Sequence, residues 1–243
     1  MKTNENLFIS DLHLTLEKPE LTRCFVNFLE GRAQQAKALY ILGDLFDSWV
    51  GDDDTTPPIG KISTALRNLH ESGTEVFLQL GNRDFLIGKQ FCELTGVKLL
   101  PDYAVIDLYG EPTLLTHGDL LCTDDLPYQE FRIKSRSPAW QDYVLSKPLW
   151  LRLLAARWYR VRSFFHKRAK TQDIMDVNAE TVAQVMLSHQ VQRLIHGHTH
   201  RPAIHDLKLD DRPAQRIVLP NWTREQMQML CFDAEGYRIE SLL

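Results

Sequence analysis

The sequence predicts an α/β fold in which short buried strands alternate with amphipathic helices. Three observations carry this prediction. Short apolar runs recur along the chain, segments with helical spacing separate them, and a cluster of polar residues follows each of five runs. This alternation is typical of a largely parallel sheet covered by helices.

The apolar runs predicted to be buried strands are LFI (7–9), ALYIL (38–42), VFLQL (76–80), TLLT (113–116) and QRLI (192–195). Residues 19–36 and 59–69 carry apolar side chains at helical spacing, and Gly73 closes the second helix. Residues 104–116 are predicted to form a hairpin that turns at Tyr109–Gly110. Shorter strands are expected at 204–209, 217–219 and 227–232.

Length and composition indicate one soluble globular domain over residues 1–243, with 44% hydrophobic and 25% charged residues. The four cysteines show no C-x-x-C spacing, which predicts free thiols in a reducing compartment such as the cytoplasm. We expect neither a signal peptide nor a membrane-spanning helix. The net charge of −4 argues against nucleic acid as the main partner.

Polar side chains follow each of the five predicted strands. In chain order they are Asp11 and His13, Asp44 and Asp47, Asn82, Arg83 and Asp84, His117 and Asp119, and His198 and His200. Because ligands of open α/β sheets bind at the carboxyl ends of the strands, the five loops are predicted to converge on one cleft.

Carboxylate, amide and imidazole donors without a thiolate favour Mn²⁺, Fe²⁺ or Zn²⁺ over Ca²⁺. Seven of these side chains are the candidate ligands: Asp11, His13, Asp44, Asn82, His117, His198 and His200. Seven ligands are too many for one open catalytic metal but fit two metals that share a carboxylate, and Asp44 is the predicted bridge. Glycines before Asp44, Asn82 and His198 are expected to turn the backbone sharply off each strand. His196 is expected to be a hydrogen-bonded residue near the core.

Three further carboxylates near these donors are expected to orient the metal-bound histidines. They are Asp47, Asp84 and Asp119.

Residues 143–172 form a basic, aromatic segment with eight Lys or Arg and no acidic residue. On a helical wheel one broad apolar face comprises Trp150, Leu151, Leu153, Leu154, Trp158, Val161, Phe164 and Phe165. Such a face either packs on the core or contacts a lipid surface, and periodicity alone leaves both interpretations open.

The ordered motifs D-x-H, G-D-x-x-D, G-N-x-D, H-G-D and G-H-T-H resemble those of the calcineurin-like metallophosphoesterases. This resemblance implies a two-sheet sandwich flanked by helices, with a helical cap inserted at about residues 124–172. Within that family, the segments ISDLHL, GNRDFLIGK, HGDLLCTDD and LIHGHTHRPA are similar to those of a branch that acts in lipid A biosynthesis. The similarity extends over about residues 6 to 222.

The resemblance to this branch implies Mn²⁺-dependent hydrolysis of the pyrophosphate bond of UDP-2,3-diacylglucosamine. Water would attack the phosphorus on the uridine side, giving UMP and 2,3-diacylglucosamine 1-phosphate. The chain would be a monomer bound peripherally to the cytoplasmic face of the inner membrane. It would bind two Mn²⁺, one at Asp11, His13, Asp44 and His200, and the other at Asp44, Asn82, His117 and His198.

The same resemblance assigns two further sets of residues. The catalytic residues would be Asp44, Asn82, Arg83 and His117. The substrate contacts would be Asn82, Arg83, Asp125, Ser163, Lys167, Lys170 and His198.

The sequence shows two departures. Arg83 stands where most members of the wider family have a histidine that acts as general acid, although the lipid A branch also has arginine there. Pro220 and Asn221 replace a Gly-Asp pair that is usual in that branch. An arginine can bind a phosphate bidentately but gives up no proton near neutral pH. Two other functions are compatible with the same motifs. One is a generic soluble phosphodiesterase or nucleotide phosphatase, and the other is a non-catalytic binding scaffold.

Overall fold

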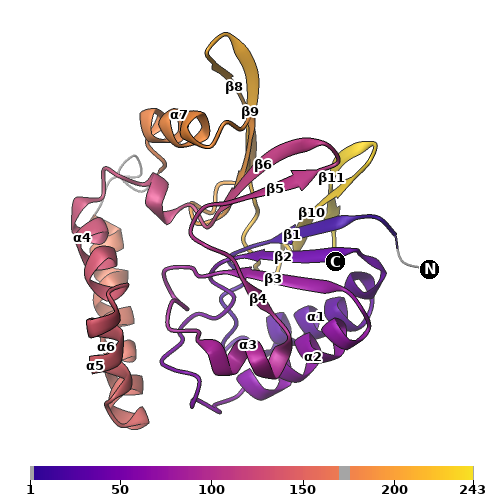
Figure 1. Cartoon of the computed structure of the whole chain (residues 1–243). Helices are drawn as coiled ribbons and strands as arrows, with labels where there is room; N and C mark the ends of the chain where they lie inside the picture. The colour runs from indigo at the N-terminus through magenta and orange to yellow at the C-terminus, as the bar shows by residue number, and fades with distance from the viewer. Residues whose placement is uncertain (1–2, 170–175, 243) are drawn as a thin grey trace.

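The protein is described by a computed structural model that covers residues 3–169 and 176–242, with only the helical backbone described for 161–169. The described strands form two sheets (Figure 1). The first has the order β11-β10-β1-β2-β3-β4 and comprises β1 (Asn6–Ile9), β2 (Ala38–Leu42), β3 (Glu75–Gln79), β4 (Lys98–Leu99), β10 (Gln228–Asp233) and β11 (Gly236–Ser241). The second has the order β5-β6-β7-β9-β8 and comprises β5 (Ala104–Leu108), β6 (Glu111–Thr116), β7 (Arg193–His196), β8 (Ala203–Leu209) and β9 (Arg212–Val218).

Helices cover the outer face of each sheet, and the two inner faces share a core. α1 (Pro19–Glu30), α2 (Ile59–Glu71) and α3 (Lys89–Thr95) lie on the first sheet, and α7 (Ala179–Ser188) packs on the second (Figure 1). Leu7 and Ile9 of β1 face the helices, whereas Phe8 packs between the sheets. Both faces of the central strands are therefore buried, which explains their continuous apolar runs.

All five predicted strands are present, but they divide between the two sheets. β1, β2 and β3 are parallel neighbours in the first sheet, and β6 and β7 are parallel neighbours in the second. The single sheet edge inferred from the strand ends is therefore wrong, and the two-sheet sandwich is confirmed. The predicted hairpin is also present, because β5 and β6 pair and Tyr109 and Gly110 both have positive φ.

The predicted helix over residues 19–36 is shorter than expected. α1 ends at Glu30, and a separate 3-10 turn, η1 (Arg32–Gln35), follows Gly31. The helices α3 and α7 and the strands β4 and β11 were not predicted.

A group of three helices, here called the helical insertion, lies beside the sheets (Figure 1). It comprises α4 (Leu126–Ser135), α5 (Pro138–Leu145) and α6 (Leu149–Ala169). The Asp125 side chain caps α4 by accepting a hydrogen bond from the Tyr128 amide, which stabilises the first turn. Among the helices of the described residues, none is long and apolar enough to cross a membrane.

Candidate active site

The loops after β1, β2 and β7 hold their polar residues in an uncommon backbone conformation. Asp11, His13, Asp44, His198 and His200 all have positive φ, between 47° and 69°. The left-handed region is sparsely populated by residues other than glycine, and clusters of such residues occur at functional sites. Sharp reversals after the strands thus aim these side chains into one space.

Gly43, Gly81 and Gly197 allow the loops of the site to approach one another. One of them adopts a backbone conformation that favours glycine, and the other two leave space for neighbouring carboxylates. Gly43 has φ +86°, as expected for a sharp turn before Asp44. Gly81 and Gly197 have no positive φ, but a Cβ on Gly81 would lie 2.1 Å from Asp44 Oδ1 and one on Gly197 would lie 2.3 Å from Asp11 Oδ2. The expectation of turn geometry is therefore wrong for Gly81 and Gly197, where glycine is required for space.

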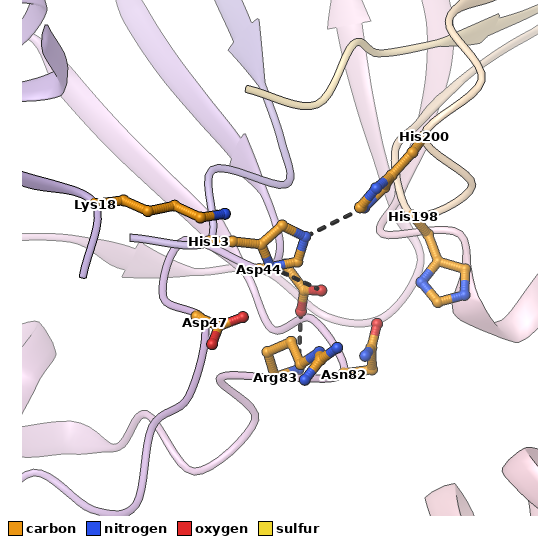
Figure 2. Close-up of a pocket in the computed structure, with 8 residues that line it drawn as sticks. All are labelled: His13, Lys18, Asp44, Asp47, Asn82, Arg83, His198 and His200. Atoms are coloured by element: carbon orange, nitrogen blue, oxygen red, sulfur yellow. Dashed lines mark hydrogen bonds and ion pairs between the residues drawn. The ribbon is translucent and has the colours of Figure 1, made fainter. Parts of the chain in front are cut away.

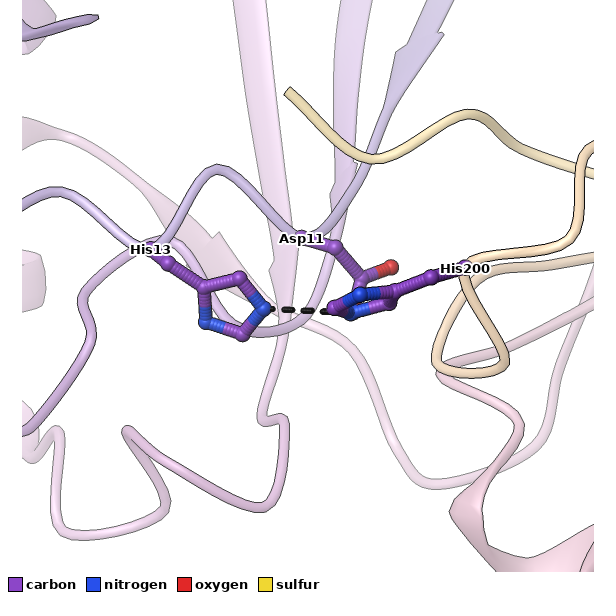
Figure 3. A group of neighbouring side chains, drawn as sticks. All are labelled: Asp11, His13 and His200. Atoms are coloured by element: carbon purple, nitrogen blue, oxygen red, sulfur yellow. Dashed lines mark hydrogen bonds and ion pairs between the residues drawn. The ribbon is translucent and has the colours of Figure 1, made fainter. Parts of the chain in front are cut away.

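Asp11, His13 and His200 form the first cluster (Figure 3). His200 Nε2 lies 3.2 Å from Asp11 Oδ1 and 3.2 Å from His13 Nε2. The other carboxylate oxygen of Asp11 accepts a hydrogen bond of 2.8 Å from the backbone amide of His198. This bond fixes the carboxylate, so that Oδ1 faces both imidazoles.

His117, Asn82 and His198 form the second cluster. His117 Nε2 lies 3.1 Å from Asn82 Oδ1 and 3.2 Å from His198 Nδ1. The opposite nitrogen of the same ring, Nδ1, lies 2.8 Å from the carbonyl oxygen of Leu42. If Nδ1 donates to that carbonyl, Nε2 keeps its lone pair free toward the site.

Asp44 lies between the two clusters. Its Oδ2 is 3.8 Å from His13 Nδ1 and its Oδ1 is 3.9 Å from His117 Nε2. Oδ1 also accepts a hydrogen bond of 2.8 Å from the Arg83 amide. Each carboxylate oxygen thus faces one imidazole of a different cluster. The His13 nitrogen that faces Asp44 is Nδ1, whereas Nε2 of the same ring faces Asp11 and His200.

Burial and charge make this site unfavourable without a cation. Burial, and after it the nearby Asp84 and Asp11 carboxylates, raise the pKa of Asp44 to about 7. Burial lowers the pKa of His13 to about 3, which keeps its imidazole neutral, the form that binds metals. Although burial alone would lower the pKa of His117, Asp44 and other carboxylates raise it to about 9.

The donor set fits a metal ion. His13 Nδ1 is buried and has no hydrogen-bond partner, and it points at the Asp44 carboxylate across a gap of 3.8 Å. Two groups of the described residues could each hold an ion: Asp11, His13 and His200, and Asp11, Asp44 and His117. A cation between such atoms would satisfy the unpaired nitrogen and offset the carboxylate charge.

A cavity of about 170 Å³ opens onto these residues (Figure 2). Arg83, Asp47 and Lys18 line it together with residues of both clusters. Lys18 was not predicted, because it precedes α1 and no strand end marks it. The cavity is smaller than a typical pocket for a whole ligand, which starts near about 300 Å³. It has room for ions and a phosphate, and the rest of a large substrate would lie outside it.

None of Asp47, Asp84 and Asp119 has a described hydrogen bond to an imidazole, in contrast to the role expected for them. Asp84 accepts hydrogen bonds from the backbone amides of Gly81 and Leu45, at 2.8 and 2.7 Å, and so joins the loops after β2 and β3. Asp119 pairs with Arg132 of α4, and Asp47 pairs with Arg160 of α6. For His117, the Leu42 carbonyl takes the orienting position instead.

His196 is fully buried, and both ring nitrogens have partners, the Gly197 carbonyl and Arg216. It therefore lies in the core, as predicted. Neither Pro220 nor Asn221 has positive φ, so this loop does not need the glycine found elsewhere in the family.

The expected substrate contacts are only partly described. Asp125 lies at the start of α4. Ser163 and Lys167 fall within α6, but their side chains lie outside the described residues, and Lys170 lies wholly outside them.

The apolar face of α6 does not pack on the core where its side chains are described. Trp150, Leu154 and Trp158 are each about 60% exposed, at 63%, 58% and 62%. Among the side chains of this helix that the structure describes, the buried one is instead Arg152, which is ion-paired with Asp53 and donates to the Val50 carbonyl. Core packing therefore does not explain the described part of the apolar face.

Carboxylates and imidazoles gathered at the carboxyl ends of strands from two stacked sheets define the class of this protein, a metal-dependent hydrolase. The Calcineurin-like phosphoesterase model matches residues 7–202, and the chain belongs to this family. Relatives named UDP-2,3-diacylglucosamine hydrolase are about half identical to it. The protein from Pseudomonas aeruginosa is 51% identical over 96% of both chains, and that from Marinobacter nauticus is 50% identical over 89% of this chain and 88% of its own. The protein from Salmonella paratyphi B is 51% identical over 90% of this chain and 91% of its own.

Proposed function

We propose that this protein hydrolyses the pyrophosphate bond of UDP-2,3-diacylglucosamine, giving UMP and 2,3-diacylglucosamine 1-phosphate. The observation that carries the proposal is the pair of neighbouring donor clusters with Asp44 within 4 Å of an imidazole of each, beside a helix with exposed apolar side chains. The names of the relatives supply the substrate.

Two Mn²⁺ ions are the proposed cofactor, held by Asp11, His13, Asp44 and His200 and by Asp44, Asn82, His117 and His198. Bound divalent ions supply a water of lowered pKa and offset the charge on phosphate oxygens. The chain's own contribution is to fix the donors: the His198 amide orients Asp11, and the Arg83 amide orients Asp44. Asn82 and His198 would also contact the substrate.

Arg83 is proposed to bind the substrate phosphates. Its side chain lines the cavity, and a guanidinium forms two parallel hydrogen bonds to phosphate oxygens. Because Arg83 cannot donate a proton near neutral pH, the uridine-side phosphorus is attacked without acid catalysis from this position.

The helical insertion is proposed to hold the acyl chains, with Asp125, Ser163, Lys167 and Lys170 contacting polar parts of the substrate. Its exposed apolar residues include Trp150, Leu151, Leu153, Leu154 and Trp158. Each buried CH₂ of an acyl chain contributes about 0.8 kcal/mol. The same apolar and basic surface would bind the monomer peripherally to the cytoplasmic face of the inner membrane.

The proposal is tested by incubating purified protein with Mn²⁺ and UDP-2,3-diacylglucosamine and measuring UMP. We expect UMP together with the lipid phosphate, and no turnover after chelation. Hydrolysis of a small soluble diester with no UMP from the lipid nucleotide would favour the generic phosphodiesterase. Absence of turnover on both substrates would favour the non-catalytic scaffold.

A further inference from the structure

Two ion pairs attach α6 to the loop that follows β2, the loop that carries Asp44. Arg152 is ion-paired with Asp53 and donates to the Val50 carbonyl. Arg160, two turns further along the helix, is ion-paired with Asp47. A Cβ on Gly51 would lie 2.2 Å from Arg152 Nη1, so the loop has glycine where the guanidinium passes. The helical insertion is thus joined to the metal-site loop by two arginines.

Asp47 has a second arginine nearby. Asp47 and Arg83 both line the cavity, on the same side of Asp44 in Figure 2. The positive charge of Arg83 and the bond from Arg160 both lower the pKa of Asp47, against the effect of burial. The Asp47 carboxylate therefore lies near two positive charges, Arg160 of the helical insertion and Arg83 of the loop after β3.

We infer that Arg160 is a positioning residue that keeps Asp47 from pairing with Arg83, so that the Arg83 guanidinium stays available to the substrate phosphate. A carboxylate and a guanidinium in one small cavity attract each other, and a pair between them would use the donors that the phosphate needs. Arg160 prevents this by pairing with the Asp47 carboxylate. The inference rests on the proposed phosphate-binding function of Arg83.

The test is a double-mutant cycle on kcat/KM, with UDP-2,3-diacylglucosamine and a small soluble phosphodiester as substrates. Arg160→Gln should lower kcat/KM about tenfold on both substrates, because Arg83 is lost to Asp47 whether or not acyl chains are present. Asp47→Asn in the Arg160→Gln background should restore most of the activity, since a neutral amide competes poorly for Arg83. Arg160→Lys, which keeps the charge, should lose less than Arg160→Gln.

The outcomes are separable. A loss on the lipid substrate alone, or a double variant no more active than Arg160→Gln, would overturn the inference, since Arg160 would then act on the acyl chains or only anchor the helix.

Inorganic phosphate as a competitive inhibitor gives a second readout. Arg160→Gln should weaken inhibition by phosphate, and adding Asp47→Asn should restore it. If Arg83→Ala keeps full activity, the proposed function of Arg83 fails first. If Arg83→Ala loses activity but the double variant shows no rescue, only the inference fails.

Discussion

Asp44 faces one imidazole of each cluster with its two carboxylate oxygens. Asp44→Ala should therefore lower metal content and reduce kcat by about a thousandfold or more. Elemental analysis of the purified variant and steady-state kinetics check both. Full metal retention in Asp44→Ala would contradict the bridging role.

The matched control for this variant is Asp206→Ala, at an exposed position on β8, which should match the parent protein. Asp53, also a surface carboxylate, is unsuitable as a control because it pairs with the buried Arg152.

Arg83 contributes to the site in two separable ways. Its backbone amide holds Asp44 Oδ1 at 2.8 Å, whereas its side chain lines the cavity. Arg83→Ala should therefore keep the metals and lose about a hundredfold in kcat/KM, with Arg83→Lys in between because an ammonium cannot form the bidentate contact. Wild-type kinetics in Arg83→Ala would remove the side chain from the site.

The sequence could indicate the donor residues because each follows an apolar strand. It could not indicate their immediate partners. The acceptor beside His117 is the carbonyl of Leu42, and a backbone group leaves no trace in residue identity. Lys18 enters the cavity from a loop that no strand end marks.

At the scale of elements, a buried carboxylate directly before β1 connects segments that are distant in sequence. Glu5 is ion-paired with Arg32 of η1 and Arg238 of β11. Against the effect of burial, hydrogen bonds from Arg238, Thr3 and Arg32 lower the pKa of Glu5 from 4.5 to about 2. The ion pair therefore stabilises the fold fully above the unfolded-state value, and this contribution is lost as the pH falls toward 2.

Glu5→Gln should lower the free energy of unfolding at about pH 7 by about 2 kcal/mol, less than the full shift implies because Arg238 is half-exposed. Denaturant unfolding at a series of pH values measures this difference. It should shrink steadily below pH 4.5. A difference that stays constant across that range would show that the charge of Glu5 is not responsible.

The exposed face of α6 allows the proposed lipid binding to be tested separately from the chemistry. Leu154→Asp with Trp158→Asp should reduce hydrolysis of the lipid nucleotide strongly while leaving a soluble diester, the metals and the fold nearly unchanged. Binding of the parent to anionic vesicles should weaken with salt, because each basic residue contributes about 1 kcal/mol near the surface and is screened.

The matched control for the α6 double variant is Leu94→Asp with Leu187→Asp, which changes exposed leucines of α3 and α7. This control should leave the hydrolysis of both substrates unchanged. Equal losses on both substrates in the α6 variant would mean that the helix supports the site generally.

Periodicity predicted an amphipathic helix here but not which of its faces is buried. Arg152, which is not part of the predicted apolar face, is the residue that the loop after β2 covers. The ion pair of a buried arginine with a carboxylate of a distant loop is a tertiary feature that helical spacing does not encode.

At the scale of the whole molecule, three strand-end loops of one sheet and two of the other meet at a single site. The sequence pattern predicted that the five loops converge but placed all five strands in one sheet. Strands of both sheets are buried on both faces, so their apolar runs do not show to which sheet each belongs. The two-sheet sandwich was predicted only from the resemblance to the calcineurin-like family.

The most direct test of this convergence is a Mn²⁺ titration of the metal-free protein followed by electron paramagnetic resonance. Two ions joined by Asp44 should bind with a stoichiometry of two per chain and show a spin-coupled signal at saturation, and His117→Ala should reduce the stoichiometry to one and abolish the coupling. Binding of a single ion, or of two ions without coupling, would contradict a dinuclear site built from both sheets.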